Sequence, residues 1–256
     1  MTFPEAGFLS QNEQEKYDEA VKSSFNSEKA RQTLCVPLKC SNLFKVIFLN
    51  QIGMTTATLP ELDRIAELDS AFLQGTYEDA PSVILRSKDD THANNNNLAK
   101  SLARLVKKRT FNEPIIINGL EIAGDENSFY GLGFKKGEKF SVIKAPDFKN
   151  KNNNRRFKRI NPDYSIDFDD DSKRTLYTGD NGLSRLCLGG VLYLYSNYDD
   201  LAYSFGDGRV VLISTGEAGS QKIQEYLKNL QSEKDKQISE INKRYVQAEK
   251  IIKGIK

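Results

Sequence analysis

Histidine and cysteine are scarce in this sequence: its 256 residues include one histidine and three cysteines. A metal motif with two histidines is therefore impossible within one chain, and a Ser-His-Asp or Cys-His arrangement would have to use His92. His92 lies in a polar segment that we expect to be a loop. Cys35, Cys40 and Cys187 are enough for a zinc set with His92, but the apolar segments around them favour buried, unreactive thiols. We expect no metal site and no disulfide framework.

Motifs that bind phosphates or calcium are also missing. The glycines at 131–137 are spaced G-x-G-x-x-x-G, which differs from the dinucleotide-binding motif, and no P-loop motif is present. Asp167, Asp169 and Asp171 alternate as in a calcium-binding loop, but Ser172 stands where that loop needs glycine. The sequence therefore favours a protein without a cofactor and leans against an enzyme. An enzyme with an unrecognised carboxylate or tyrosine site is kept as one hypothesis.

Long apolar runs are absent as well. No run approaches the roughly 20 residues that a membrane helix needs, and the first residues lack the basic and apolar parts of a signal peptide. Hydrophobic residues make up 38% of the chain and charged residues 28%, with a net charge of only +2. We expect a soluble, cytoplasmic protein without a membrane partner.

The first half of the sequence, 1–114, alternates between helix-like and strand-like patterns. A helix is predicted over 10–32, where Ser10 and Glu13 have the spacing of a capping box. Further helices are predicted over 59–73 and 98–109, and strands over 33–38, 43–49 and 83–85. These elements predict an N-terminal α/β region.

The next segment, 115–215, is rich in Gly, Asn, Asp and aromatic residues between short apolar runs. The letters KKGE at 135–138 predict a hairpin turn. Strands are predicted at 183–188, 191–196, 201–205 and 209–214, separated by Gly- and Asp-containing turns. This spacing is typical of an antiparallel meander, so we predict an α+β protein with a β-rich barrel or sandwich in its C-terminal half.

The last segment, 216–256, has apolar residues at steps of three and four and charged residues between them. This stripe predicts a coiled-coil helix that pairs with itself or with another protein. The predicted oligomerisation residues are Ile223, Leu227, Leu230, Ile238, Ile241, Tyr245 and Ile252. A long helix of this kind, together with the lack of catalytic motifs, favours our first hypothesis: a non-catalytic oligomeric assembly or scaffold protein.

A basic stretch raises the second hypothesis. Ten Lys and Arg residues lie between Lys135 and Arg159, with only two acidic residues among them, and phenylalanines are interleaved. Cations and aromatic rings on a β-rich domain are typical of single-stranded nucleic-acid binding. The predicted contacts are Lys151, Arg155, Arg156, Phe157, Lys158 and Arg159, with Arg104, Lys107 and Lys108 on the predicted helix 98–109.

An alternative interpretation of the same stretch stays open. The segment 163–171 that follows contains five aspartates, and an Asn- and Lys-rich tract is also typical of a solvated surface insertion. Either the basic half contacts phosphates, or the acidic half neutralises it within the same loop.

Overall fold

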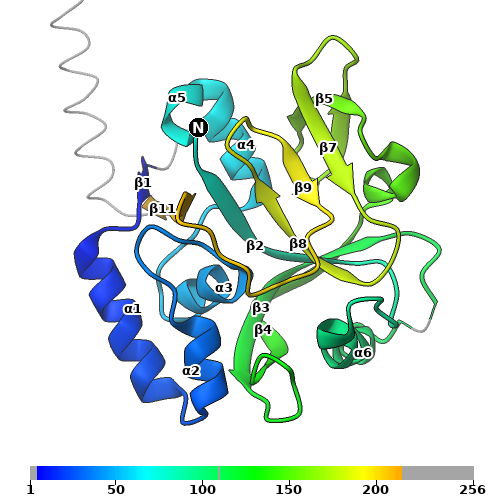
Figure 1. The fold of residues 1–256 in the computed structure, drawn as a ribbon. Coiled ribbons are helices and arrows are strands. Elements are labelled where there is room, and N and C mark those ends of the chain that lie inside the picture. Colours follow the sequence, from blue (N-terminus) through cyan, green and yellow to red (C-terminus); the bar gives the residue numbers. More distant parts are fainter. Residues whose placement is uncertain (1–4, 109, 215–256) are drawn as a thin grey trace, which may run out of the picture. The chain divides into compact units, whose positions relative to one another are not determined.

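The α-helices come before residue 106 in the computed structural model, which describes residues 5–108 and 110–214 (Figure 1). Their bounds are α1 Gln11–Ser24, α2 Glu28–Leu34, α3 Leu43–Gln51, α4 Leu59–Leu68, α5 Ser70–Leu73 and α6 Asn96–Leu105. The predicted capping box at α1 is confirmed, since the Ser10 and Glu13 side chains and backbone amides bond reciprocally. None of the helices over the described residues is long and apolar enough to cross a bilayer. The predicted coiled coil lies outside these residues.

Two predicted strands, 33–38 and 43–49, are wrong. The first covers the end of α2 and the loop after it, and the second is helix α3. Every residue from Leu43 to Leu49 is buried, so α3 shows no polar face, and a short apolar run of this kind fits a buried strand equally well. The helix start is set by Asn42, whose side chain accepts a hydrogen bond from the Lys45 amide at 2.8 Å.

The strands form one large open sheet, with β4, β3, β2, β8, β9, β7, β5 and β6 in spatial order and β10 beside β2. Their bounds are β2 Tyr77–Leu85, β3 Ile115–Gly124, β4 Leu132–Lys144, β5 Arg156–Ile160, β6 Ile166–Phe168, β7 Arg174–Thr178, β8 Leu183–Leu188, β9 Leu194–Ser196 and β10 Gly208–Arg209. A separate two-stranded sheet joins β1 Glu5–Phe8 to β11 Val211–Ser214. The α+β class is confirmed.

The sheet differs in two ways from the antiparallel barrel or sandwich that the sequence predicts. It does not close, because its end strands β4 and β6 are not paired with each other among the described residues. Two of its pairings, β7 with β9 and β10 with β2, are parallel. The strand predicted at 201–205 is also absent, since that segment forms turns. Strand β2 pairs with both β3 and β8, so residues predicted to be two domains share one sheet within the compact unit 6–213.

The predicted turn at KKGE is instead a bulge inside the continuous strand β4. The register between β3 and β4 shifts between Asn118 and Leu120, where β4 carries extra residues. Gly119 allows the shift: its φ is +64°, and a Cβ there would lie 2.2 Å from the backbone oxygen of Lys139. Turn-forming residues therefore mark the irregularity correctly, but the chain reverses earlier, between β3 and β4.

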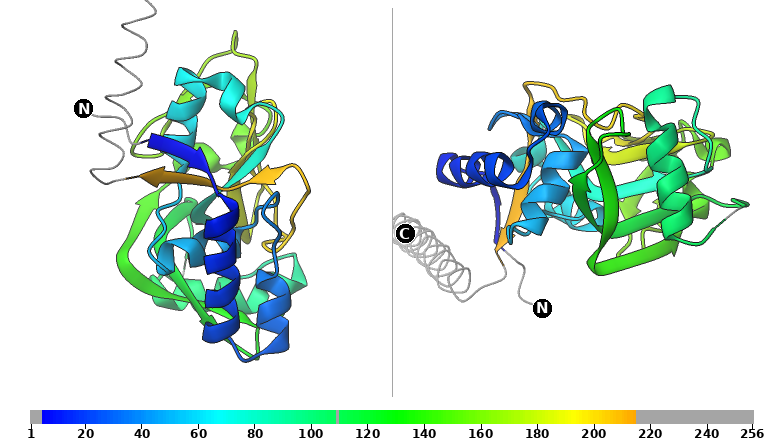
Figure 2. Two further views of the ribbon diagram at one scale, coloured as in Figure 1. Left: turned by 90° about the vertical axis from the view of Figure 1, so that its left-hand side faces the viewer. Right: turned by 90° about the horizontal axis from the view of Figure 1, so that it is seen from below.

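Two hydrophobic cores lie on opposite faces of the sheet. In β3, Ile115 and Ile117 belong to the first core and Ile116 to the second, as strand alternation requires. Helix α3 packs on β2 and β3, and α6 packs on β4, while α4 packs on β2, β5 and β8 (Figure 2). The described residues also include three short 3-10 helices: η1 Ala93–Asn95, η2 Pro146–Phe148 and η3 Asn150–Asn152.

The three cysteines and the histidine differ in their surroundings. Cys187 is buried, as predicted, but Cys35 is exposed and Cys40 half-buried in the loop after α2, so the prediction of buried thiols is wrong for these two. Their segment is a surface loop, not a core strand. His92 lies in the predicted loop, where its amide bonds to the Asp90 carboxylate at 2.9 Å.

Candidate functional site

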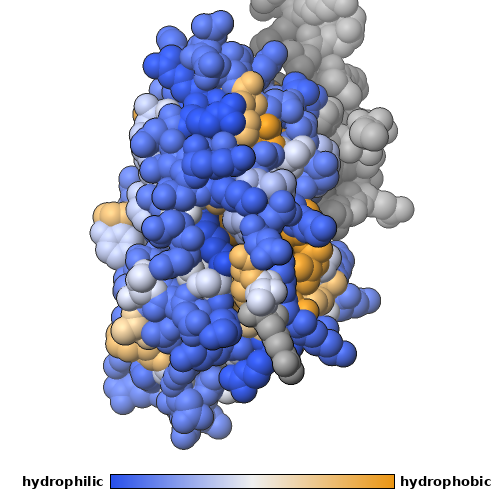
Figure 3. All heavy atoms as spheres, turned by 90° about the vertical axis from the view of Figure 1, so that its right-hand side faces the viewer, coloured by the Kyte–Doolittle hydropathy of each residue, from blue (hydrophilic) through white to orange (hydrophobic). Residues whose placement is uncertain are grey.

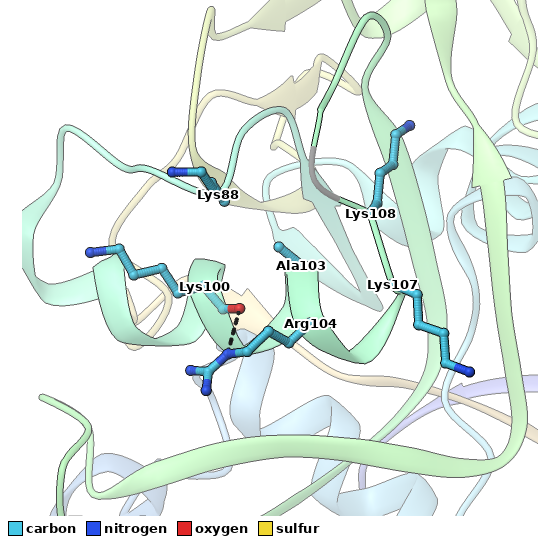
Figure 4. Close-up of a pocket in the computed structure, with 6 residues that line it drawn as sticks. All are labelled: Lys88, Lys100, Ala103, Arg104, Lys107 and Lys108. Carbon is cyan, nitrogen blue, oxygen red and sulfur yellow. Dashed lines mark hydrogen bonds between the residues drawn. The ribbon is translucent and has the colours of Figure 1, made fainter.

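The C-terminal half of α6 forms one side of a basic pocket. Leu98 and Leu102 bury the apolar side of the helix in the first core, which leaves Lys100 and Arg104 exposed to solvent. The pocket has a volume of about 610 Å³ (Figure 4). We call it the cationic pocket; it is lined by Lys88, Lys100, Ala103, Arg104, Lys107 and Lys108.

The end of α6 places the last two cations. The Lys107 amide donates to the Arg104 carbonyl at 3.0 Å, and the Lys108 amide donates to the Ala103 carbonyl at 2.9 Å. These two bonds form a Schellman motif, which normally has glycine at the left-handed position. Here Lys107 occupies that position with φ +55°. A side chain in this conformation costs roughly 1–2 kcal/mol, so the chain keeps a lysine where glycine is more stable.

Lys88 lies in the loop that follows β2, and the fold brings this loop to the pocket. Its ammonium group pairs with the exposed Asp89 carboxylate at 2.7 Å. The hydrogen bond from Lys88, together with the charges of Lys88 and Lys100, lowers the pKa of Asp89. The Asp89 carboxylate therefore offsets part of the positive charge at the Lys88 end of the pocket. At the other end of the pocket, Lys108 lies 5.1 Å from the centre of the Phe111 ring.

The cations do not converge on one point. In Figure 4, Lys88, Lys100 and Arg104 extend to one side of Ala103, and Lys107 and Lys108 extend to the other side. Arg104 is oriented by the hydrogen bond from its Nε to the Lys100 carbonyl, 3.3 Å long. A single small anion would meet only some of these groups, whereas a ligand with several spaced negative charges would meet them all. The pocket offers positive charge and hydrogen-bond donors, which are the means of holding phosphates or carboxylates.

The predicted nucleic-acid contacts fall in two places. Arg104, Lys107 and Lys108 lie together in the cationic pocket, with Lys88 and Lys100, which the prediction missed. The others lie on or just before β5, in the hairpin with β6, and they are Lys151, Arg155, Arg156, Phe157, Lys158 and Arg159.

The arginines of β5 are engaged by neighbouring groups. Arg159 pairs with Glu67 of α4 at 2.7 Å, and the hydrogen bond and charge of Glu67 raise the arginine pKa. Arg156 donates to the Asp170 carbonyl at 3.1 Å. Arg155 lies 3.6 Å above the Phe168 ring. The acidic half of the hairpin thus contacts Arg155 and Arg156 through a ring and a backbone carbonyl, whereas the ion pair of Arg159 is made with α4.

Phe157 lies in the second core and is fully buried, with the Arg174 guanidinium 4.4 Å from its ring centre. A nucleic-acid base has no access to this ring. Phe157 and Ile160 both face the core although they are three residues apart, because the register of β5 with β6 shifts between Phe157 and Arg159. Lys151 and Lys158 are exposed.

Two groups with strongly shifted pKa values, Lys45 and Glu78, lie in the protein interior. Burial lowers the pKa of Lys45 to about 8, and its ammonium group donates to Gln14 Oε1 and to the carbonyls of the loop before α3. Burial raises the pKa of Glu78 to about 8. Neither residue lines the cationic pocket. These two groups affect the stability of the fold, and no sequence pattern predicted their burial.

The surface on the right-hand side of Figure 1 is mostly hydrophilic, with scattered apolar residues (Figure 3). Over the described part of the chain, no three His, Cys, Asp or Glu side chains are grouped as metal ligands. Comparisons with protein-family models, with curated proteins and with solved structures find no match to the chain. The chemistry of the cationic pocket is therefore the best guide to function.

Proposed function

We propose that the protein binds single-stranded nucleic acid through the cationic pocket. The observation that carries the proposal is the grouping of five cations, from the β2–α6 loop, α6 and the residues after it, around one concavity. Each phosphate that a lysine or arginine neutralises releases counterions from the strand, which favours binding. The Phe111 ring beside Lys108 adds a neighbouring aromatic group.

The spread of the cations supports a flexible polyanion over a single phosphate. A single strand bends easily and can bring successive phosphates to cations that point in different directions. This proposal moves the principal contact from the basic stretch 135–160 to α6. The change rests on two features of β5: Phe157 is buried, and Arg159 pairs with Glu67 of α4.

A pair of charge reversals tests the proposal. We expect Lys100→Glu/Arg104→Glu to weaken binding of a fluorescently labelled oligothymidine at least tenfold, because two cations become anions. The matched control, Lys151→Glu/Lys158→Glu, makes the same change of charge on the β5 hairpin and is expected to weaken binding less than about threefold. Fluorescence anisotropy measures both, and circular dichroism checks folding. A larger loss in the control variant would contradict the pocket, and tighter binding of a duplex would contradict the preference for single strands.

The Lys107→Gly variant separates binding from folding. Glycine adopts a positive φ without strain, so this variant is expected to be about 1 kcal/mol more stable to urea than the wild type. It lacks one of the five cations and is expected to bind oligothymidine more weakly. Gain of stability with unchanged affinity would show that Lys107 does not contact the ligand.

A second candidate function is that of a non-catalytic assembly protein, supported by the apolar stripe of the sequence over 216–256. It is compatible with nucleic-acid binding, since oligomers bind a strand at several points. We expect Ile238→Lys/Ile241→Lys in the full chain to lower the mass that light scattering measures after size-exclusion chromatography. An unchanged mass would contradict a homotypic coiled coil.

A further inference from the structure

Tyrosine rings form a row on one face of the sheet, on strands β7 and β9 and the loop after β9. Leu176 and Leu194 face the second core, so Tyr177 of β7 and Tyr195 of β9 face the opposite side. These two tyrosines are partners in the parallel pairing, and their rings stack with centroids 5.1 Å apart and planes at 11°. Tyr198 continues the stack at 4.9 Å from Tyr195.

The row continues through an arginine to a second aromatic group. The Arg185 guanidinium lies 5.2 Å from the Tyr198 ring and 5.7 Å from the Tyr77 ring. Tyr77 contacts Phe205, whose ring lies 4.1 Å from that of Tyr203. The outer rings reach solvent, with exposed fractions of 37% for Tyr198, 42% for Tyr203 and 44% for Phe205. Tyr193 also contacts Tyr177, with ring centroids 5.7 Å apart. We call this the aromatic surface; its rings are Tyr177, Tyr193, Tyr195, Tyr198, Tyr203 and Phe205.

Aspartates are neighbours in the chain of the exposed aromatic residues. Asp199 and Asp200 directly follow Tyr198 in the chain, and Asp207 follows Phe205 by two positions. Asp199 and Asp207 are exposed, and neither carboxylate has an ion pair within 5–108 and 110–214. Arg185, which lies between the rings, is buried and paired with Asp79 at 3.0 Å, and Arg209 donates to the Gly206 and Gly208 carbonyls on either side of Asp207. Along the chain next to the exposed rings, three aspartates therefore stand against one arginine, Arg209.

We propose that the aromatic surface binds a cationic, arginine-rich segment of a partner protein. Tyrosine faces attract cations, and arginine is favoured over lysine because its planar guanidinium stacks on rings and bonds to carboxylates with two parallel hydrogen bonds. Within the protein, the Arg185 guanidinium already lies between the Tyr77 and Tyr198 rings, and its Nη1 donates to both carboxylate oxygens of Asp79. The proposal does not rest on nucleic-acid binding, since the aspartates next to the exposed rings repel phosphates.

The test uses a fluorescent peptide of eight arginines and the full protein in low salt. We expect the peptide to bind, and an equal peptide of eight lysines to bind more weakly. Tyr203→Leu, which keeps an apolar side chain without a ring, is expected to weaken arginine-peptide binding roughly two- to fivefold. Tyr203→Phe keeps the ring and the affinity. Asp199→Asn/Asp207→Asn is expected to weaken binding roughly two- to tenfold.

The charge-reversed pocket variant, Lys100→Glu/Arg104→Glu, is the control for site and for non-specific attraction. When Tyr203→Leu is added to this variant, it is expected to weaken arginine-peptide binding by the same factor as in the wild type, whatever happens to oligothymidine binding. Circular dichroism of every variant checks that the fold is intact. The proposal is overturned if the arginine peptide fails to bind, if binding ignores both the tyrosine and the aspartate substitutions, or if Tyr203→Leu weakens binding of oligothymidine instead.

Discussion

The Glu78→Gln variant is expected to be more stable than the wild type, by an amount that is small near pH 5 and grows to a few kcal/mol above about pH 8. Glu78 is buried in β2, where its Oε1 accepts a hydrogen bond from Thr76 and its Oε2 has no partner in the described residues. Burial raises the pKa of this carboxyl from 4.5 to about 8, against the Thr76 hydrogen bond, and the negative charge of Asp79 adds to the rise.

The sign follows from proton binding. The folded chain holds the Glu78 proton more tightly than the unfolded chain, so this group stabilises the fold fully below its unfolded pKa of 4.5. That stabilisation is lost as the pH rises from 4.5 to about 8, because the unfolded carboxyl ionises first. Glutamine cannot ionise and avoids the loss.

Urea unfolding at several pH values measures this difference. Glu138→Gln, on the exposed part of β4, is the matched control and is expected to follow the wild type at every pH. A Glu78→Gln variant that is less stable than the wild type above pH 8, or whose difference does not change with pH, would contradict the buried, protonated carboxyl.

The second large effect concerns the buried ion pair. Arg185→Met is expected to cost about 3–5 kcal/mol, because it leaves the Asp79 charge buried without its partner. The side chains are 1% and 0% exposed, and the Arg185 Nη1 also donates to the Tyr203 carbonyl at 2.8 Å. The Asp79 carboxylate would keep only the hydrogen bond from Ser41, 2.8 Å long.

Lys135→Met is the matched control for this substitution. Lys135 pairs with Glu121 at a similar distance, 2.9 Å, but the two side chains are 51% and 32% exposed. An exposed pair contributes about 0–1 kcal/mol, so the control is expected to unfold close to the wild type. Similar midpoints of urea unfolding for the two variants would show that burial does not govern the strength of these pairs.

Helices that carry a capping box or an amphipathic face could be predicted from the sequence. The capping box at Ser10 and the amphipathic face of α6 both correspond to helices in the fold. Helix α3 was missed because its apolar run is buried on all sides and has no helical periodicity to read. The bulge at KKGE was read as a turn, because turn residues mark both, and only the pairing of β4 with β3 distinguishes them.

The candidate site could be predicted only where its residues are neighbours in the chain. Arg104, Lys107 and Lys108 stand out as a basic cluster, whereas Lys88 joins them only because the loop after β2 runs beside α6. The burial of Phe157 depends on which face of β5 meets the core, which the sheet decides. Rows of tyrosines from β7 and β9 likewise require the parallel pairing, and no local pattern indicates it.

The most direct test of the cationic pocket is the salt dependence of oligothymidine binding to the wild-type protein. Five cations that neutralise five phosphates predict a slope of about −3.5 for the logarithm of the association constant against the logarithm of salt concentration, from about −0.7 per phosphate. Anisotropy titrations from low to moderate salt measure it. A slope near that value supports a pocket in which all five cations contact the strand. A slope near zero, or no binding even in low salt, would contradict it.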